Sequence, residues 1–309
     1  MTDAPAQPGR RLLRDVAVVA WQELADALRS RRALVVLLLF FLGSVAGTLL
    51  SIKFIHTVEK SLSGVLGLEA GTGTGGTTAT LWKSQWFRST VTNMVDDKSL
   101  AEALLNVPPL SLFFSVIAFL FTPMLVMLTA APRLAEEIWS GSARFALFRT
   151  TRLAWCLGKF SGQALLLLAA LLASVPAAWL CGLLRMTDYP AWATFAAMFV
   201  FAGKAWLYGL AFLGLATGIS MLFRSPGLAT AAGLIALMGV TAVFHLSRHF
   251  AGPGWRRLLD VVQLLMPRAH YYDLLRPELA HSLSAALYLA LLGLGYLMIG
   301  YARLARRDL

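Results

Sequence analysis

The residues best suited to chemistry lie in one polar stretch, from Arg133 to Lys159, between two long apolar segments. It carries adjacent carboxylates at Glu136 and Glu137 together with several arginines. Paired carboxylates can serve acid–base chemistry, but a catalytic site also needs partner groups converging at one depth. No apolar segment contains a Glu/His pair or a Ser/His set. We therefore interpret the stretch as a contact surface and predict no catalytic residue.

Two glycine motifs resemble parts of nucleotide-binding loops, and each lacks the rest of its motif. Residues 71–76 (GTGTGG) have the spacing of the dinucleotide fingerprint, but that motif needs a preceding buried strand and a following helix. Residues 71–80 instead have the composition of a flexible linker. Gly158 and Lys159 are followed by Phe, not Ser or Thr, and lack the upstream P-loop glycine. The chain therefore has no nucleotide-binding motif.

Lys204 is the one charge well inside a predicted membrane span. A charge in hydrocarbon is costly and by default marks a functional pathway. Tyr208, one turn further on, shares its helix face, so these two are our possible pathway residues. The surrounding apolar run is longer than a membrane requires, so Lys204 could instead extend outward to the interface. We favour this second interpretation.

The histidines and cysteines point to no further site. His245 and His249 have the four-residue spacing of a metal-binding pair, but no third ligand lies nearby. We predict interfacial histidines and no metal. Cys156 is expected in the loop before the third span and Cys181 near the far end of that span, so the two should not pair.

The elements that must position these residues are apolar helices. The 309 residues are 58% hydrophobic and 14% charged, with a mean hydropathy of +0.68, which indicates a membrane protein. The net charge of +11 resides in short loops between apolar runs, which argues for topology signals and against nucleic-acid binding. We predict an all-α polytopic membrane protein with about six spans, at residues 33–52, 109–131, 160–184, 195–223, 227–246 and 283–301.

The positions of basic residues predict that both chain ends are cytoplasmic. Arginine clusters directly abut the first span (Arg29, Arg31, Arg32) and the last one (residues 303–307). Residues 1–32 form a cytoplasmic amphipathic helix, in which leucines and alanines recur at three- and four-residue spacing. This helix either lies on the membrane surface, with Trp21 at headgroup depth, or packs on the protein's own cytoplasmic face.

Two segments are expected on the far side of the membrane from the chain ends. Residues 53–108 form an extracytoplasmic loop of about 55 residues, with a possible helix over Phe54–Leu66. Residues 252–280 are semi-apolar and interrupted by prolines, so we predict a shallow re-entrant or interfacial helix pair. Tyr271 and Tyr272 suit the headgroup level.

The stretch between the second and third spans resembles membrane subunits of bacterial ABC exporters of the type-2 permease class. In that class acidic residues are followed by a glycine, a short helix, an arginine-containing turn and a Gly-Lys pair that opens the next span. The matching positions are Glu136, Glu137, Gly141, Arg144, Arg152, Gly158 and Lys159. The charged N-terminal helix, the basic C-terminus and a turn at residues 223–226 are similar to the same class. The sequence departs from the class pattern at residues 142–144 and 150–151, which leaves the register of the short helix open.

The resemblance implies that the seven matching residues contact a separate ABC ATPase subunit, which would supply ATP and Mg²⁺; this chain would hold no cofactor. It also implies a homodimer or heterodimer of permeases in the lipid of a bacterial inner membrane. The substrate would be an exported lipid, glycan or other amphiphile. Physically, the contact helix would keep Ile138, Phe145 and Phe148 against the bundle. An intramembrane enzyme and a non-transporting scaffold are the alternatives.

Overall fold

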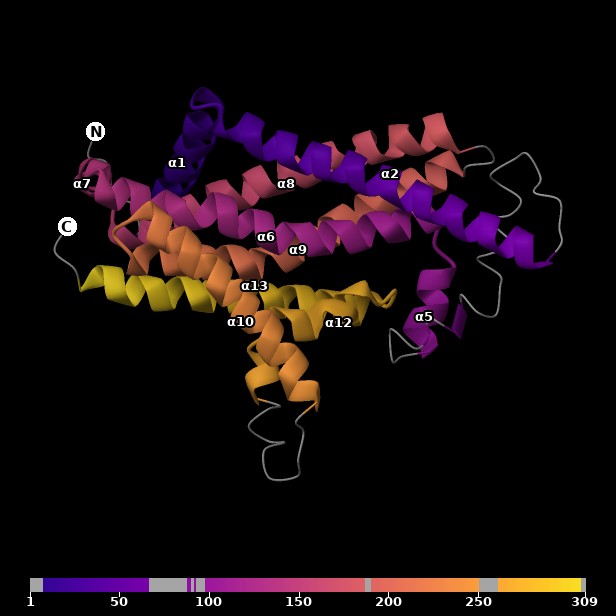
Figure 1. The fold of residues 1–309 in the computed structure, drawn as a ribbon. Helices are drawn as coiled ribbons and strands as arrows, with labels where there is room; N and C mark the ends of the chain where they lie inside the picture. Colours follow the sequence, from indigo (N-terminus) through magenta and orange to yellow (C-terminus); the bar gives the residue numbers. More distant parts are fainter. Residues whose placement is uncertain are drawn as a thin grey trace.

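A computed structural model shows a bundle of long helices that run roughly side by side (Figure 1). It describes residues 8–66, 88–89, 92, 98–186, 190–249 and 261–306. Within these residues every regular element is helical. In chain order the elements are α1 (Pro8–Arg29), α2 (Arg32–Leu66), α5 (Lys98–Leu105), α6 (Pro109–Trp139), α7 (Ser142–Leu147), α8 (Arg152–Arg185), α9 (Ala191–Leu222), α10 (Pro226–His249), η1 (Pro267–His270), α12 (Tyr271–Leu275) and α13 (Leu279–Ala305).

Six of these helices are long and apolar enough to cross a membrane, which confirms the predicted number of spans. They are α2, α6, α8, α9, α10 and α13. Helix α1 and the end of α13 lie at the same end of the bundle as α7, and we call this the terminal end (Figure 1). The other end, where α5 lies, is called the opposite end.

Several helices extend further than the sequence predicted. The first predicted span stops at residue 52, yet α2 continues without a break to Leu66 and includes the separate helix expected after it. At the terminal end, α6 continues to Trp139 and α8 already begins at Arg152. Cys156 therefore lies buried on α8 and not in a loop; both cysteines are free. Charged residues ended the predicted spans, but they do not end a helix that leaves the hydrocarbon.

The centre of the bundle is α9, which packs against α6 on one side and α13 on the other. Its contact with α13 depends on glycine: a methyl group on Gly214 would collide with the backbone of Gly293. On α13, a methyl group on Gly300 would meet the backbone of Gly218 in the same way. Small residues let helix backbones touch, so the α9–α13 pair is one of the closest contacts in the bundle.

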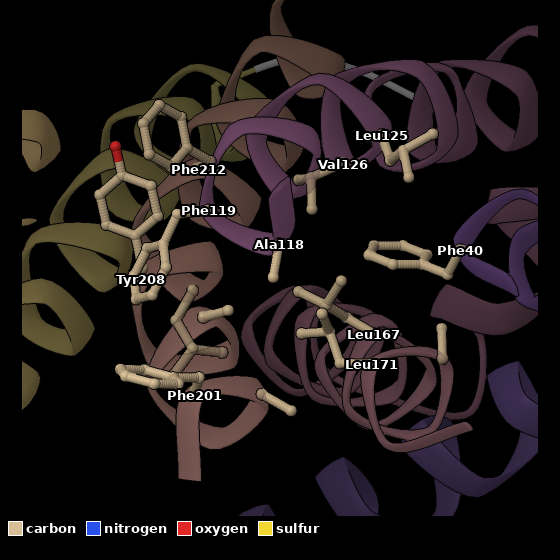
Figure 2. Packing of buried hydrophobic residues seen from close by; sticks show 14 of the residues in the cluster. Phe40, Ala118, Phe119, Leu125, Val126, Leu167, Leu171, Phe201, Tyr208 and Phe212 are labelled. Atoms are coloured by element: carbon tan, nitrogen blue, oxygen red, sulfur yellow. The ribbon is translucent and has the colours of Figure 1, made fainter. Parts of the chain in front are cut away.

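The apolar core is continuous across α2, α6, α8 and α9. Figure 2 shows Phe40 and Ala118 pointing toward Leu167 and Leu171, where α2 and α6 meet α8. Burial of such side chains cannot by itself drive helix association in lipid, because lipid tails are equally apolar. The interlocking shapes and small residues at these contacts therefore hold the helices together.

The predicted re-entrant region, residues 252–280, is described from residue 261 onward; this part contains helical residues 261–264 and the short helices η1 and α12. Tyr271 packs against Phe119 and Tyr208, with ring centroids 4.9 and 6.1 Å apart. Its ring thus contacts both α6 and α9, and its place at headgroup level stays a prediction. The predicted linker at residues 71–80, with its glycine motif, lies outside the described residues.

Helix α1 is amphipathic as predicted, but its buried face differs from the predicted one. Leu13 and Leu28, which belong to the recurring leucines and alanines that predicted the apolar face, are exposed. The buried positions are Val19, Ala20 and Ala27, together with the carboxylate-bearing Glu23. This face packs against α8, so the helix lies on the protein itself, while Trp21 faces outward.

Candidate coupling site

A tight turn joins the end of α6 to α7 at the terminal end of the bundle. Ser140 caps α6, and Gly141 follows with a φ of 75°, a left-handed conformation that glycine adopts without strain. The six-residue helix α7 then runs from Ser142 to Leu147. The Thr151 hydroxyl accepts a hydrogen bond from the Ala154 amide and caps the start of α8. Glycine is thus needed at position 141 for the turn itself.

Three aromatic side chains around this turn are exposed on the surface of the protein. Trp139 is 71% exposed, Phe145 76% and Phe148 85%. The prediction that Phe145 and Phe148 pack against the bundle is therefore wrong. Helix α7 is too short to present a full apolar face inward, and Ala143 is its only buried residue. Arg144 is exposed beside them, so the surface of α7 combines aromatic rings with a cation.

Charged side chains from α1, α6 and α8 form a largely buried ion network together with one glutamine; we define the ion network as Glu23, Arg133, Glu137, Lys159 and Gln163. The Lys159 Nζ lies 2.5 Å from Glu23 Oε2 and 2.5 Å from Glu137 Oε1. Arg133 donates to Glu23 Oε1 through Nη2 at 2.7 Å and Nε at 3.0 Å. Gln163 donates to the same oxygen at 2.6 Å. The network therefore fixes α1 to both helices that flank α7.

Glu23 is the centre of the network, with only 1% of its surface exposed. Burial acts to raise the pKa of its carboxyl group, but the charges of Lys159 and Arg133 and their hydrogen bonds act more strongly in the opposite direction. The pKa is therefore lowered below its ordinary value of 4.5. The carboxylate is ionised at neutral pH, and its two oxygens accept four hydrogen bonds.

The seven residues predicted to contact an ATPase do not share one surface. Glu136 and Arg144 face outward, whereas Glu137 and Lys159 pair inside the ion network. The contact roles of all seven stay a prediction, and the structure supports them best for the two outward ones.

Arg152 and Gly158 have packing roles that the sequence did not indicate. Arg152 donates to the carbonyl oxygens of Leu304 and Ala305, at the C-terminus of α13, where a cation is favourable. At Gly158 a methyl group would lie 2.5 Å from the Cβ atom of Val19, so this glycine lets α1 approach α8. Both residues join helices at the terminal end.

The two possible pathway residues lie one turn apart on α9, and both contact α12 or its end. Lys204 donates to the carbonyl oxygens of Leu275 and Arg276, at 3.3 and 3.2 Å. It thus caps the end of α12, and our interpretation that it extends to the membrane interface stays a prediction. Tyr208 is buried between aromatic rings, 5.0 Å from Phe212 between centroids (Figure 2). A pathway role for either residue stays a prediction.

Sequence reasoning missed Glu23, Arg133 and Gln163 as members of one cluster. A local signal for Glu23 was present, because it occupies the same helix face as the buried Val19, Ala20 and Ala27. A carboxylate on the apolar face of an amphipathic helix requires a partner of opposite charge from elsewhere in the fold.

These features define an α-helical polytopic membrane protein with exposed aromatic side chains at one end and no nucleotide motif in its sequence. The sequence profile of the family described as ABC-2 family transporter protein matches residues 17–309. The chain therefore belongs to the ABC-2 transporter family, as a membrane component of a transporter and not its catalytic part. A comparison with curated proteins gives no match.

Proposed function

We propose that this protein is the permease subunit of an ABC exporter, and that a separate ATPase subunit docks on the surface of α7. The observation that carries the proposal is the group of exposed aromatics Trp139, Phe145 and Phe148 beside Arg144. Aromatic and arginine side chains dominate the binding energy of protein interfaces. A permease would need such a surface, because the energy for transport would come from a partner subunit.

Force applied to this surface would be transmitted to the membrane spans. Helix α7 lies between the ends of α6 and α8, which continue as rigid helices through the bundle. The Lys159–Glu137 pair ties these two ends together. Movement of α7 would therefore shift both spans and α1 as a unit. ATP and Mg²⁺ would be held by the ATPase subunit.

The substrate we propose is an amphiphile such as a lipid or glycolipid. The buried polar groups in the described spans are mostly hydroxyls, for example Ser115, Thr217 and Ser174, which donate to carbonyls of their own helices. Such groups offer little coordination for a hydrophilic solute. We place two permease chains, identical or different, in a bacterial inner membrane with the terminal end in the cytoplasm.

Co-purification with an ABC ATPase subunit, sought as a neighbouring reading frame with a Walker A motif, tests the docking surface. We expect Phe145→Ser combined with Phe148→Ser to lower the amount of retained ATPase by about tenfold or more, since interface hot spots contribute about 2 kcal/mol each or more. Phe54→Ser, at an exposed phenylalanine of α2 far from α7, is the control and should retain it. Retention of the ATPase by the double variant would refute docking on α7.

Charge reversal gives a second test at the same surface. Glu136→Lys and Arg144→Glu alter outward groups and should weaken ATPase binding without affecting the fold. Glu137→Lys is unsuitable for this purpose, because Glu137 pairs with Lys159 in the buried network. If neither outward reversal changes ATPase retention, the charged part of the proposed contact is wrong.

A further inference from the structure

An open pocket of about 480 Å³ lies at the opposite end of the bundle, between α2 and the end of α8. It is lined by the apolar Leu49 and Ile52, the hydroxyl-bearing Thr57, and the basic Lys53, His56 and Arg185. Lys53 and His56 come from the last turns of the candidate span of α2, and Arg185 is the final residue of α8. By length, the basic groups thus lie where the hydrocarbon gives way to lipid headgroups.

The basic groups of this pocket differ from those of the buried ion network in having no acidic partner. Among the described residues, no ion pair joins Lys53, His56 or Arg185 to a carboxylate. All three side chains are exposed. Two cations and an imidazole therefore line one concave site, and none of the described carboxylates balances them, which favours an anion from outside the chain.

The apolar side of the pocket continues along the membrane-facing surface of α2. Leu42, Leu49, Lys53 and His56 follow one another at three-, four- or seven-residue spacing, which places them on one face of the helix. Leu42 is 52% and Leu49 40% exposed, so this face is open beside the pocket. The site thus has a cationic end and an apolar extension along the direction of the lipid chains.

We propose that this pocket binds an anionic phospholipid, with the phosphate between Lys53, His56 and Arg185 and an acyl chain along Leu49 and Leu42. Arginine and lysine form charge-assisted hydrogen bonds with phosphate oxygens, and arginine can do so through two N–H groups. A second copy of the chain is a poorer occupant, because symmetric pairing through this face would bring like charges together. The site lies at the far end from α7 and does not depend on the proposed ATPase contact.

Native mass spectrometry of the full chain, released from nanodiscs of equal phosphatidylglycerol and phosphatidylcholine, tests the proposal. Wild type is expected to retain phosphatidylglycerol in preference to phosphatidylcholine. Lys53→Gln combined with Arg185→Gln should lower retained phosphatidylglycerol by about 25-fold, at about fivefold for each cation at an anionic membrane surface. Lys53→Arg combined with Arg185→Lys keeps both charges and should retain the lipid.

The matched control removes two exposed cations outside the pocket, through Lys98→Gln and Arg224→Gln. This control should bind lipid as wild type does, and an unchanged melting temperature of each variant verifies its fold. Equal loss in the control, or full retention in the pocket variant, would overturn the proposal. Displacement of the lipid by excess inorganic phosphate would instead identify a site for free anions. A change from dimer to monomer in the pocket variant would assign the face to a second copy, against the proposal.

Discussion

The two ends of the bundle use basic residues in opposite ways. At the terminal end, Arg133 and Lys159 are nearly buried and each contacts more than one carboxylate. At the opposite end, Lys53 and Arg185 are exposed, line an open pocket, and form no ion pair among the described residues. Paired, buried charges fix the positions of helices, whereas unpaired charges at a membrane boundary are available to ligands.

The same difference between buried and exposed charges occurs within the terminal end, between two adjacent residues. Glu137 points into the network and is 19% exposed, whereas Glu136 beside it is 41% exposed. Adjacent residues on one helix thus serve different purposes. Their order in the sequence, two glutamates in a row, does not show which one is buried.

Neutralising Glu23 should have the largest effect on stability. Glu23→Gln leaves Arg133 and Lys159 with too little negative charge, and breaking a buried ion pair in this way costs about 3–5 kcal/mol. The free energy of unfolding, measured by denaturant titration of the solubilised protein, is the readout. Lys53→Gln at the opposite end is the matched control and should change it by less than about 0.5 kcal/mol. Similar losses in both variants would contradict the proposed difference between the two ends.

A methyl group at Gly158 should separate α1 from α8 at intermediate cost. Its carbon would lie 2.5 Å from Val19 Cβ and 3.0 Å from the Val16 carbonyl oxygen, so Gly158→Ala should destabilise by about 1–3 kcal/mol. Protease cleavage within α1 should also become faster. Gly203→Ala has no atom within 4 Å of the new carbon and should be neutral or stabilising by up to about 1 kcal/mol. If α1 stays protected in Gly158→Ala, its packing on α8 is looser than described.

The smallest effect on stability is expected for Glu136→Gln. Glu136 lies 3.8 Å from Arg133 at the surface, and exposed ion pairs of this kind contribute about 0–1 kcal/mol. Thermal unfolding of this variant should match that of wild type within about 0.5 kcal/mol, while ATPase retention decreases. Strong destabilisation would mean that Glu136 belongs to the ion network and not to the contact surface.

Much of the fold could be predicted because helix formation in a membrane is local. Six apolar segments predict six spans, and the turn at residues 223–226 lies where α9 ends and α10 begins. The ends of α6 and α8 could not be predicted from hydropathy, because the helices continue past the point where apolar residues stop. The buried face of α1 could not be predicted from hydropathy either, because Glu23 is polar but buried.

The amino-acid sequence alone determined that this protein is a bundle of membrane helices with an amphipathic N-terminal helix and no nucleotide motif. Hydropathy and helical spacing involve neighbouring residues, so one chain suffices to reveal them. Only the tertiary structure decided which charges pair, since Glu23 lies 110 positions from Arg133 and 136 from Lys159. Whether a charge stabilises the fold or remains open to a ligand depends on the helices packed around it. The spacing of residues in the sequence does not predict which helices those are.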